Sequence, residues 1–222
     1  MGLHQEREGD MERILPYLFL SVTGFLSGSV VYSYFLPKLL FKKDILKISD
    51  DGNPGCANVF KYVGIPMGIL CLVLDFFKGY VPVFIASHML SQESLLFALV
   101  IASPAAGHAF SPFLRFKGGK AINVSFGSLA GLMPRFPTVW WLVIPFVILS
   151  TVFRLNPHSL RVAVSFSTML VLSLLFDRSA SVTLAVLLLC VSVLYRHLPG
   201  YIKGGYKEGQ LKFLNFTLWG RQ

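Results

Sequence analysis

The stretch GILCLVLDFFKGYVPV, residues 68–83, decides the fold class of this chain. It lies within an apolar run from 63 to 86, which is long enough to cross about 30 Å of hydrocarbon as a helix. Two charged residues, Asp75 and Lys78, stand three apart in this run and therefore share one helical face. Because each charge would cost about 2.5 to 3.5 kcal/mol at the bilayer centre, we expect them to pair or to line a polar interior.

The composition of the whole chain agrees with this stretch. Hydrophobic residues make up 54% of the 222 residues and charged residues only 14%, which is far outside the range of soluble proteins. Six further apolar runs lie at roughly 14–37, 94–113, 121–134, 138–153, 160–176 and 180–195. We therefore predict an all-α fold: a polytopic transmembrane bundle of about seven helices, forming one domain over 1–222. The run 121–134 is long enough only for a partial crossing.

The positions of the cations predict the orientation of the bundle. Fifteen of the 20 Lys and Arg residues fall on one side of the predicted topology, in alternate loops and in the tail 196–222. The polar N-terminal segment 1–13 falls on the other side. Since cytoplasmic loops carry an excess of Lys and Arg, we expect an external N-terminus and a cytoplasmic C-terminus. That arrangement needs an odd number of crossings, which five would satisfy as well as seven.

The charge distribution and the cysteines indicate neither nucleic-acid binding nor a disulfide framework or metal site. The net charge of +9 is spread over short loops and forms no continuous basic stripe, so nucleic acid is not expected as a partner. Three cysteines, two of them in apolar runs, have neither the spacing of a disulfide framework nor that of a metal site. We expect no structural disulfide and no bound zinc.

A polar segment, GHAFSPFLRFKGGKAIN at 107–123, lies between two apolar runs on the predicted cytoplasmic face. Gly118 and Gly119 would let the backbone approach a ligand closely, and a helix starting near Lys120 would direct its free N–H groups at that ligand. An anion, most plausibly phosphate, would fit there. Lys117 and Lys120 are either ligands of this anion or topology signals only.

The histidine of this segment, His108, has two interpretations. It is either a helix-end histidine bonded to a carbonyl, or a general base or phosphate ligand. His197 has the same ambiguity, because it ends the last apolar run where a cation suits the helix dipole. Ser29, in a Gly-Ser context, indicates close helix packing more strongly than substrate contact.

The loop DILKISDDGNPGCANVFKYVG, residues 44–64, is a second polar cluster on the same predicted face. Asn53 and Gly55 belong to a tight turn, and Asn58 and Lys61 follow on the start of a helix. A solvated connector would have such residues too. Two clusters rich in Gly, Asn and Lys on one face favour a shared polyanion site.

Four motifs together resemble one family. They are GSVVYSYFLPK at 28–38, GNPGCANV at 52–59, GILCLVLDFFKGYVPV at 68–83 and GHAFSPFLRFKGGK at 107–120. In this order and spacing they resemble the bacterial integral-membrane glycerol-3-phosphate acyltransferases that use acyl phosphate, the PlsY type. The family is described as a fold of seven helices with its motif loops on the cytoplasmic side.

The resemblance implies the first step of phospholipid synthesis. A fatty acyl group would pass from acyl phosphate to the 1-hydroxyl of glycerol 3-phosphate, giving lysophosphatidate and phosphate. The implied location is the bacterial cytoplasmic (inner) membrane, as a multi-pass protein with its site facing the cytoplasm. The implied partners are the two substrates and the lipid bilayer; no cofactor, metal, coenzyme A or acyl-carrier protein is implied, and the chain is compatible with a monomer.

The motifs and the resemblance together assign roles to particular residues. Catalytic roles fall to His108, Lys117 and His197. Phosphate binding falls to Asn53, Gly55, Asn58, Lys61, Gly118, Gly119 and Lys120, and further candidates are Ser29, Asp51, Asp75, Lys78, Arg161 and Ser165.

The chain also departs from the family pattern. Leu46, Asp51 and Ala57 stand where the family has Arg, Ser and Thr, and Ala163 stands where it has Ser. Asp51 matters most, because it puts a negative charge where the phosphate groups of the substrates would meet. Two like unit charges 4 Å apart repel each other by about 4 kcal/mol at an effective dielectric of 20. Either Asp51 points away from the site or the ligand is less anionic. Three functions therefore follow: an acyltransferase of this family, a homologue acting on another acceptor, and a non-catalytic membrane binder or regulator.

Overall fold

The computed structural model describes residues 2–203, 210–213 and 216–219, and the side chains of residues 11–198. Over this part of the chain the apolar runs form helices, and the all-α transmembrane class is confirmed. The elements are α1 (Gly2–Ser29), α2 (Tyr32–Phe41), α3 (Ile45–Ile48), α4 (Cys56–Tyr62), α5 (Ile65–Met89), α6 (Phe97–Ala109), the 3-10 turn η1 (Pro112–Leu114), α7 (Ile122–Ala130), α8 (Val139–Thr151), β1 (Phe153–Asn156), α9 (His158–Phe176), α10 (Ala180–Lys203), β2 (Gln210–Phe213) and β3 (Phe216–Trp219).

Within the described residues, five segments are long and apolar enough to cross a membrane. They are Met11–Phe41, Ile65–Met89, Phe97–Leu114, His158–Phe176 and Ala180–Leu198. Helix α7 has nine residues and α8 has 13, so each is shorter than the roughly 20 residues that a crossing needs. The number of crossings and their orientation stay predictions.

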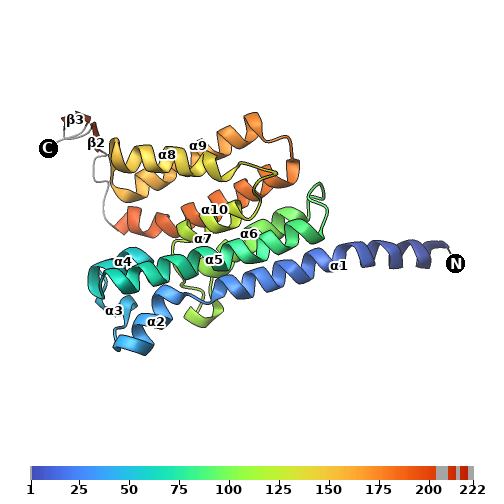
Figure 1. Cartoon of the computed structure of the whole chain (residues 1–222), viewed down its shortest axis with the longest axis horizontal. Coiled ribbons are helices and arrows are strands. Elements are labelled where there is room, and N and C mark those ends of the chain that lie inside the picture. The colour runs from blue at the N-terminus through green and yellow to red at the C-terminus, as the bar shows by residue number, and fades with distance from the viewer. Residues whose placement is uncertain (1, 204–209, 214–215, 220–222) are drawn as a thin grey trace.

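The helices lie in layers that run roughly parallel to one another (Figure 1). Helices α8 and α9 form one outer layer, α7 and α10 lie between, and α1, α5 and α6 form the opposite layer. The short helices α2, α3 and α4 gather at the left-hand end of Figure 1, the end at which α10 finishes. The start of α1 lies at the other end. The first long helix, α1, therefore begins at the end of the bundle opposite to that at which the last long helix, α10, finishes.

A small antiparallel sheet, with the strand order β1-β2-β3, adds to the predicted helices. Strand β1 comes directly after α8 and pairs with β2, so that Phe153 lies opposite Phe213. The helical periodicity of the preceding apolar run gave no sign of this strand. Residues 204–209, 214–215 and 220–222 of the predicted tail lie outside the described part.

The first apolar run, 14–37, forms two helices and not one. Helix α1 ends at Ser29 and α2 begins at Tyr32, with Val31 in a non-helical conformation. The break frees the carbonyl of Val30 from the helical hydrogen-bond ladder, and the Lys78 ammonium on α5 donates to it at 2.7 Å. A backbone group that would be unsatisfied in hydrocarbon is thereby paired.

Glycines bring the backbones of α1 and α6 into direct contact. A Cβ atom added at Gly28 would lie 2.0 Å from the Pro104 carbonyl oxygen, and one added at Gly107 would lie 2.0 Å from that of Phe25. Ser29 beside them is buried and donates to Phe25 in its own helix at 2.7 Å. The packing interpretation of the Gly-Ser pair is the one that these contacts support.

We expect Gly107→Ala to destabilise the protein by about 2 kcal/mol or more, because the new methyl group would meet backbone and not a movable side chain. Thermal unfolding of the purified protein in detergent measures the effect. Leu99→Ala, on the exposed face of the same helix, is the control and should change the midpoint little. An unchanged midpoint for Gly107→Ala would contradict the close backbone contact.

Candidate active site

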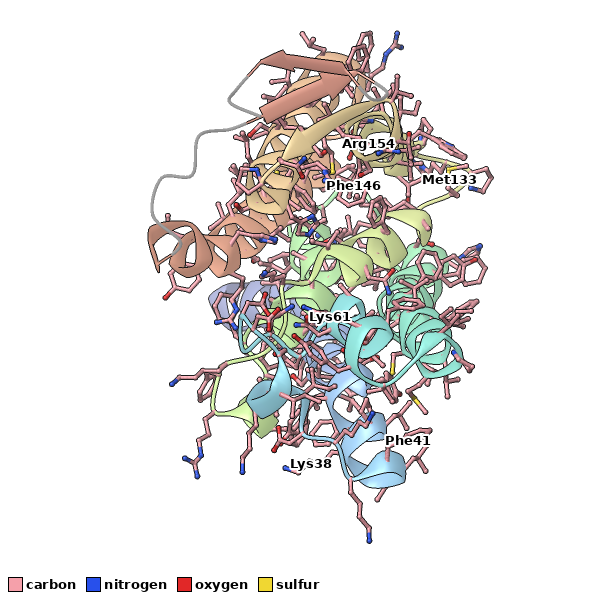
Figure 2. All side chains as sticks on the ribbon, turned by 90° about the vertical axis from the view of Figure 1, so that its left-hand side faces the viewer. Lys38, Phe41, Lys61, Met133, Phe146 and Arg154 are labelled. Atoms are coloured by element: carbon pink, nitrogen blue, oxygen red, sulfur yellow. The ribbon has the colours of Figure 1, made fainter. Side chains whose placement is uncertain are left out.

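A cavity of about 330 Å³ lies where the loop before α4 faces the start of α7. Its lining combines polar groups with the apolar side chains of Leu72, Phe126 and Phe146. Figure 2 views the end of the bundle that carries α4, with Phe146 above Lys61. The lining residues are Asp51, Asn53, Gly55, Cys56, Ala57, Asn58, Leu72, Asp75, His108, Lys120, Ala121, Ile122, Asn123, Phe126, Phe146 and His158.

The buried charges of α5 lie directly beside this cavity. Lys78 Nζ is 2.7 Å from Asp75 Oδ1, and both side chains are almost fully buried. The same ammonium donates to the Val30 carbonyl and, at 2.8 Å, to Nδ1 of His108. The ammonium therefore has two hydrogen-bond acceptors and one ion-pair partner. The pairing of Asp75 with Lys78 that the sequence predicts is confirmed, and Asp75 also lines the cavity.

This contact decides which nitrogen of His108 carries the proton. An ammonium group has no lone pair, so Nδ1 must accept its hydrogen bond, and the proton of the neutral ring then sits on Nε2. His108 is 4% exposed and lines the cavity. At its free nitrogen the ring is a hydrogen-bond donor and not a base.

The Gly118–Gly119 pair packs against His108. A Cβ atom added at Gly118 would lie 1.9 Å from the His108 carbonyl oxygen, and one added at Gly119 would lie 2.2 Å from its Nε2. The two N–H groups donate to the carbonyls of Ala109 and His108 at 3.2 and 3.0 Å. The guanidinium of Arg196 donates to both glycine carbonyls. The close approach predicted for these glycines is present, but it is made to His108, and their N–H groups are not free.

Free N–H groups come instead from the start of α7. Ala121, Ile122 and Asn123 line the cavity, and the first N–H groups of an α-helix have no partner inside the helix. The partial positive charge of the helix N-terminus adds to that of Lys120, which directly precedes it. This part of the site matches the expectation from the sequence.

Asp51 points into the cavity. Its Oδ2 is 2.8 Å from Lys120 Nζ, and its Oδ1 accepts from the Asn58 amide at 2.8 Å and from the Asn53 N–H at 3.2 Å. Burial opposes ionisation of this carboxyl, but the bonds from Lys120 and Asn58 outweigh it and hold the pKa of Asp51 below its usual range. The alternative from the sequence, that Asp51 points away from the site, is wrong, because Asp51 lines the cavity.

A family model described as glycerol-3-phosphate acyltransferase matches residues 18–203. The chain belongs to this family. Curated relatives include a glycerol-3-phosphate acyltransferase 1 of Thermotoga maritima, 43% identical over 50% of this chain and 54% of its own length. The glycerol-3-phosphate acyltransferase of Helicobacter pylori (strain 26695) is 35% identical over 60% of this chain and 67% of its own length. This chain spans between about half and two thirds of the length of the curated relatives that it matches first.

Two solved structures share the fold of this acyltransferase family member. Both are of PlsY (YgiH), described as an integral membrane glycerol 3-phosphate acyltransferase, one in a glycerol 3-phosphate form and one in a lysophosphatidic acid form. The first has a TM-score of 0.73 at 23% identity and covers 85% of this chain and 91% of its own. The second has a TM-score of 0.70 at 22% identity.

The structure brings seven of the 16 predicted site residues to this one cavity, from separate parts of the chain. Those that line it are Asn53, Gly55, Asn58, Lys120, His108, Asp51 and Asp75. Gly118, Gly119 and Lys78 lie directly behind this wall, in contact with His108. The polar cluster at 44–64 and the one at 107–123 therefore face each other, as the sequence predicts.

Two predicted cations do not line the cavity. The exposed side chain of Lys61 pairs with Asp50 at 2.6 Å, and this hydrogen bond raises the pKa of Lys61 to about 12. Lys117 is exposed in the loop after η1. Sequence spacing could not show the direction of either side chain.

Three of the further candidates also lie away from it. Ser29 is buried at the contact of α1 with α6. Arg161 donates to the Leu155 carbonyl at 3.0 Å, and Ser165 donates to the Arg161 carbonyl at 2.9 Å, so both groups serve the local structure at the start of α9.

A second histidine, His158, lines the cavity and was missed from the sequence. Its ring centroid lies 6.0 Å from that of His197, whose Nδ1 is bonded to the Val193 carbonyl and whose buried Nε2 has no hydrogen-bond partner. His197 is therefore next to the cavity wall without forming part of it. The signal in the sequence was a histidine directly after Pro157, at the start of an apolar run.

The three thiols are free, and among the described residues no group of three His, Cys, Asp or Glu side chains could hold a metal ion. Cys56 lines the cavity, and burial, together with the nearby Asp75 carboxylate, raises the pKa of its thiol well above the usual range.

We therefore expect N-ethylmaleimide to modify Cys56 roughly tenfold or more slowly at pH 8 than an exposed thiol, because little thiolate is present. Ser91→Cys, at an exposed position, supplies the matched control, and peptide mass analysis separates the sites. The Cys56 rate should still be rising at pH 10. A plateau near pH 9 would contradict the raised pKa.

Proposed function

We propose that this protein transfers a fatty acyl group from acyl phosphate to the 1-hydroxyl group of glycerol 3-phosphate, giving lysophosphatidate and inorganic phosphate. The observation that carries the proposal is the cavity, whose lining combines hydrogen-bond donors suited to phosphate with apolar side chains. Lys120, the Asn58 amide and the start of α7 suit an anionic head group, while Phe126 and Phe146 suit an alkyl chain. Membership of the family supports the acceptor, and the motif resemblance supports the donor.

The reaction needs positioning and charge neutralisation more than a nucleophile of the protein, because acyl phosphate is already activated. The acceptor oxygen attacks the carbonyl carbon, a C–O ester bond forms, and the bond from that carbon to the phosphate oxygen breaks. The phosphate leaves with the bonding electron pair. Since His108 presents an N–H at its free nitrogen, it cannot accept the proton of the attacking hydroxyl group. That proton goes to a phosphate oxygen, and His108 holds the same phosphate by donating a hydrogen bond to it.

The proposed location is the bacterial inner membrane, with the cavity opening to the cytoplasm. The elements α2, α3 and α4 lie at the same end of the bundle and carry most of the cations of the first predicted cytoplasmic loop (Figure 1). Both substrates carry phosphate and would approach from water on that side. Their acyl group would enter from the bilayer.

A second candidate function is acylation of an acceptor that carries no phosphate, such as glycerol. The specific observation in its favour is the Asp51 carboxylate, which cancels the charge of Lys120 inside the cavity.

The deciding experiment is phosphate release from palmitoyl phosphate by the purified protein in lipid nanodiscs. Release that requires glycerol 3-phosphate supports the proposal, and release with glycerol alone supports the second candidate. No release with either acceptor would mean a non-catalytic protein.

In this assay we expect Lys120→Gln to lower kcat/KM for glycerol 3-phosphate by roughly tenfold to a hundredfold, because a charge-assisted bond to phosphate is lost. Lys117→Gln should lower it less, since Lys117 is exposed outside the cavity wall. Arg115→Gln, which removes an exposed cation from the same loop, is the matched control. Equal losses in all three would show that the loop acts through its overall charge.

The donor role of His108 predicts that the amide of Gln can partly replace the ring. His108→Gln should retain at least about tenfold more activity than His108→Ala, because its side-chain N–H can occupy a place near that of Nε2. Equal inactivity of the two folded variants would indicate a base instead, because the amide of Gln can donate a hydrogen bond but cannot accept a proton from the hydroxyl group.

A further inference from the structure

Asp51 collects the donors that a phosphate group would need. Three of its contacts, from Lys120, from the Asn58 amide and from the Asn53 N–H, come from residues that line the cavity. Both carboxylate oxygens accept at least one of these bonds. An ammonium group, an amide and a backbone N–H are the groups that proteins use to bind oxyanions. The site therefore already contains an anion, and that anion belongs to the chain itself.

The turn before α4 aims Asp51 inward and its neighbour outward. Gly52 adopts a positive φ of 58°, and its N–H donates to the Ser49 carbonyl at 3.3 Å. On this turn Asp50 bonds to Lys61 and to the Tyr62 hydroxyl, and does not line the cavity. Two adjacent aspartates thus have separate partners, which provides a matched pair for experiment.

Lys120 is placed so that it can change partners. It lies two residues before Ile122, the first residue of α7, its side chain is about one-quarter exposed, and its flexible stem ends at the Asp51 carboxylate. A phosphate bound at the start of α7 would lie close to the Asp51 carboxylate. Because the negative charges of the phosphate and of the Asp51 carboxylate repel strongly when they lie close together, two outcomes are possible. The phosphate either displaces Asp51 from Lys120 or binds weakly beside it.

We propose that Asp51 acts as an internal competitor for the anion-binding donors of the cavity and sets how tightly the site binds a phosphate group. The inference rests on the proposed function, because it concerns the same phosphate-binding site. It makes Asp51 a specificity-determining residue: its charge lowers the affinity for anionic acceptors relative to neutral ones. The low pKa of Asp51 keeps that charge in place at neutral pH.

The test is equilibrium binding of inorganic phosphate and of glycerol 3-phosphate to the full-length protein in detergent, measured by isothermal titration calorimetry without any acyl donor. Asp51→Asn keeps the shape and removes the charge, and Asp50→Asn removes the same charge from the neighbouring position. We expect Asp51→Asn to tighten binding of both anions by about tenfold or more, and Asp50→Asn to change it by less than about twofold. The gain should disappear in the double variant Asp51→Asn/Lys120→Gln.

Unchanged or weaker binding in Asp51→Asn would overturn the inference, because Asp51 would then organise the donors and not compete for them. Equal gains in the two single variants would overturn it as well, since they would reflect the net charge of the loop. Absence of phosphate binding in every protein, with normal thermal unfolding, would show that the donors form no anion site. If Asp51→Asn binds tightly while no variant transfers an acyl group, the inference stands and the acyltransferase proposal fails.

Discussion

The ammonium of Lys78, buried in an apolar bundle, is the constraint on which the rest of this structure depends. A charge in hydrocarbon requires partners, and Lys78 has three: it forms an ion pair with Asp75 on its own helix and hydrogen bonds with the Val30 carbonyl and His108. These contacts fix the break between α1 and α2, hold α5 against α6, and orient the histidine ring. The geometry of the cavity follows from satisfying one cation.

The glycines complete this arrangement by setting how closely the backbones approach. Gly28 and Gly107 join α1 to α6, and Gly118 and Gly119 fold the loop after α6 back onto His108. Because Arg196 donates to the carbonyls of that loop, the last long helix is tied to the same place. Groups that are far apart in the chain are therefore held together in one place.

The sequence predicted most of this fold and about half of the site, and the difference has a physical reason. Apolar runs identify helices because hydrocarbon leaves the backbone few alternatives, and an i, i+3 ion pair such as Asp75 with Lys78 is local. Lys61 and Lys117 were less predictable because the direction of a long side chain on a loop depends on its tertiary neighbours. The contact of Gly119 with His108, and the approach of His158 to the cavity, join distant residues and leave no local pattern.

Helix α7, whose start lines the cavity, packs differently against its two neighbours, α5 and α8. On one side of α7, a Cβ added at Gly127 would lie 2.0 Å from the Phe76 carbonyl oxygen of α5, so these two helices meet backbone against backbone. On the other side α7 meets α8 through the rings of Phe126 and Phe146, whose centroids are 5.5 Å apart. Backbones in contact cannot yield, whereas two rings can turn about their own bonds. A change in the shape of the cavity next to α7 would therefore occur on the α8 side, where these two rings lie, and not on the α5 side.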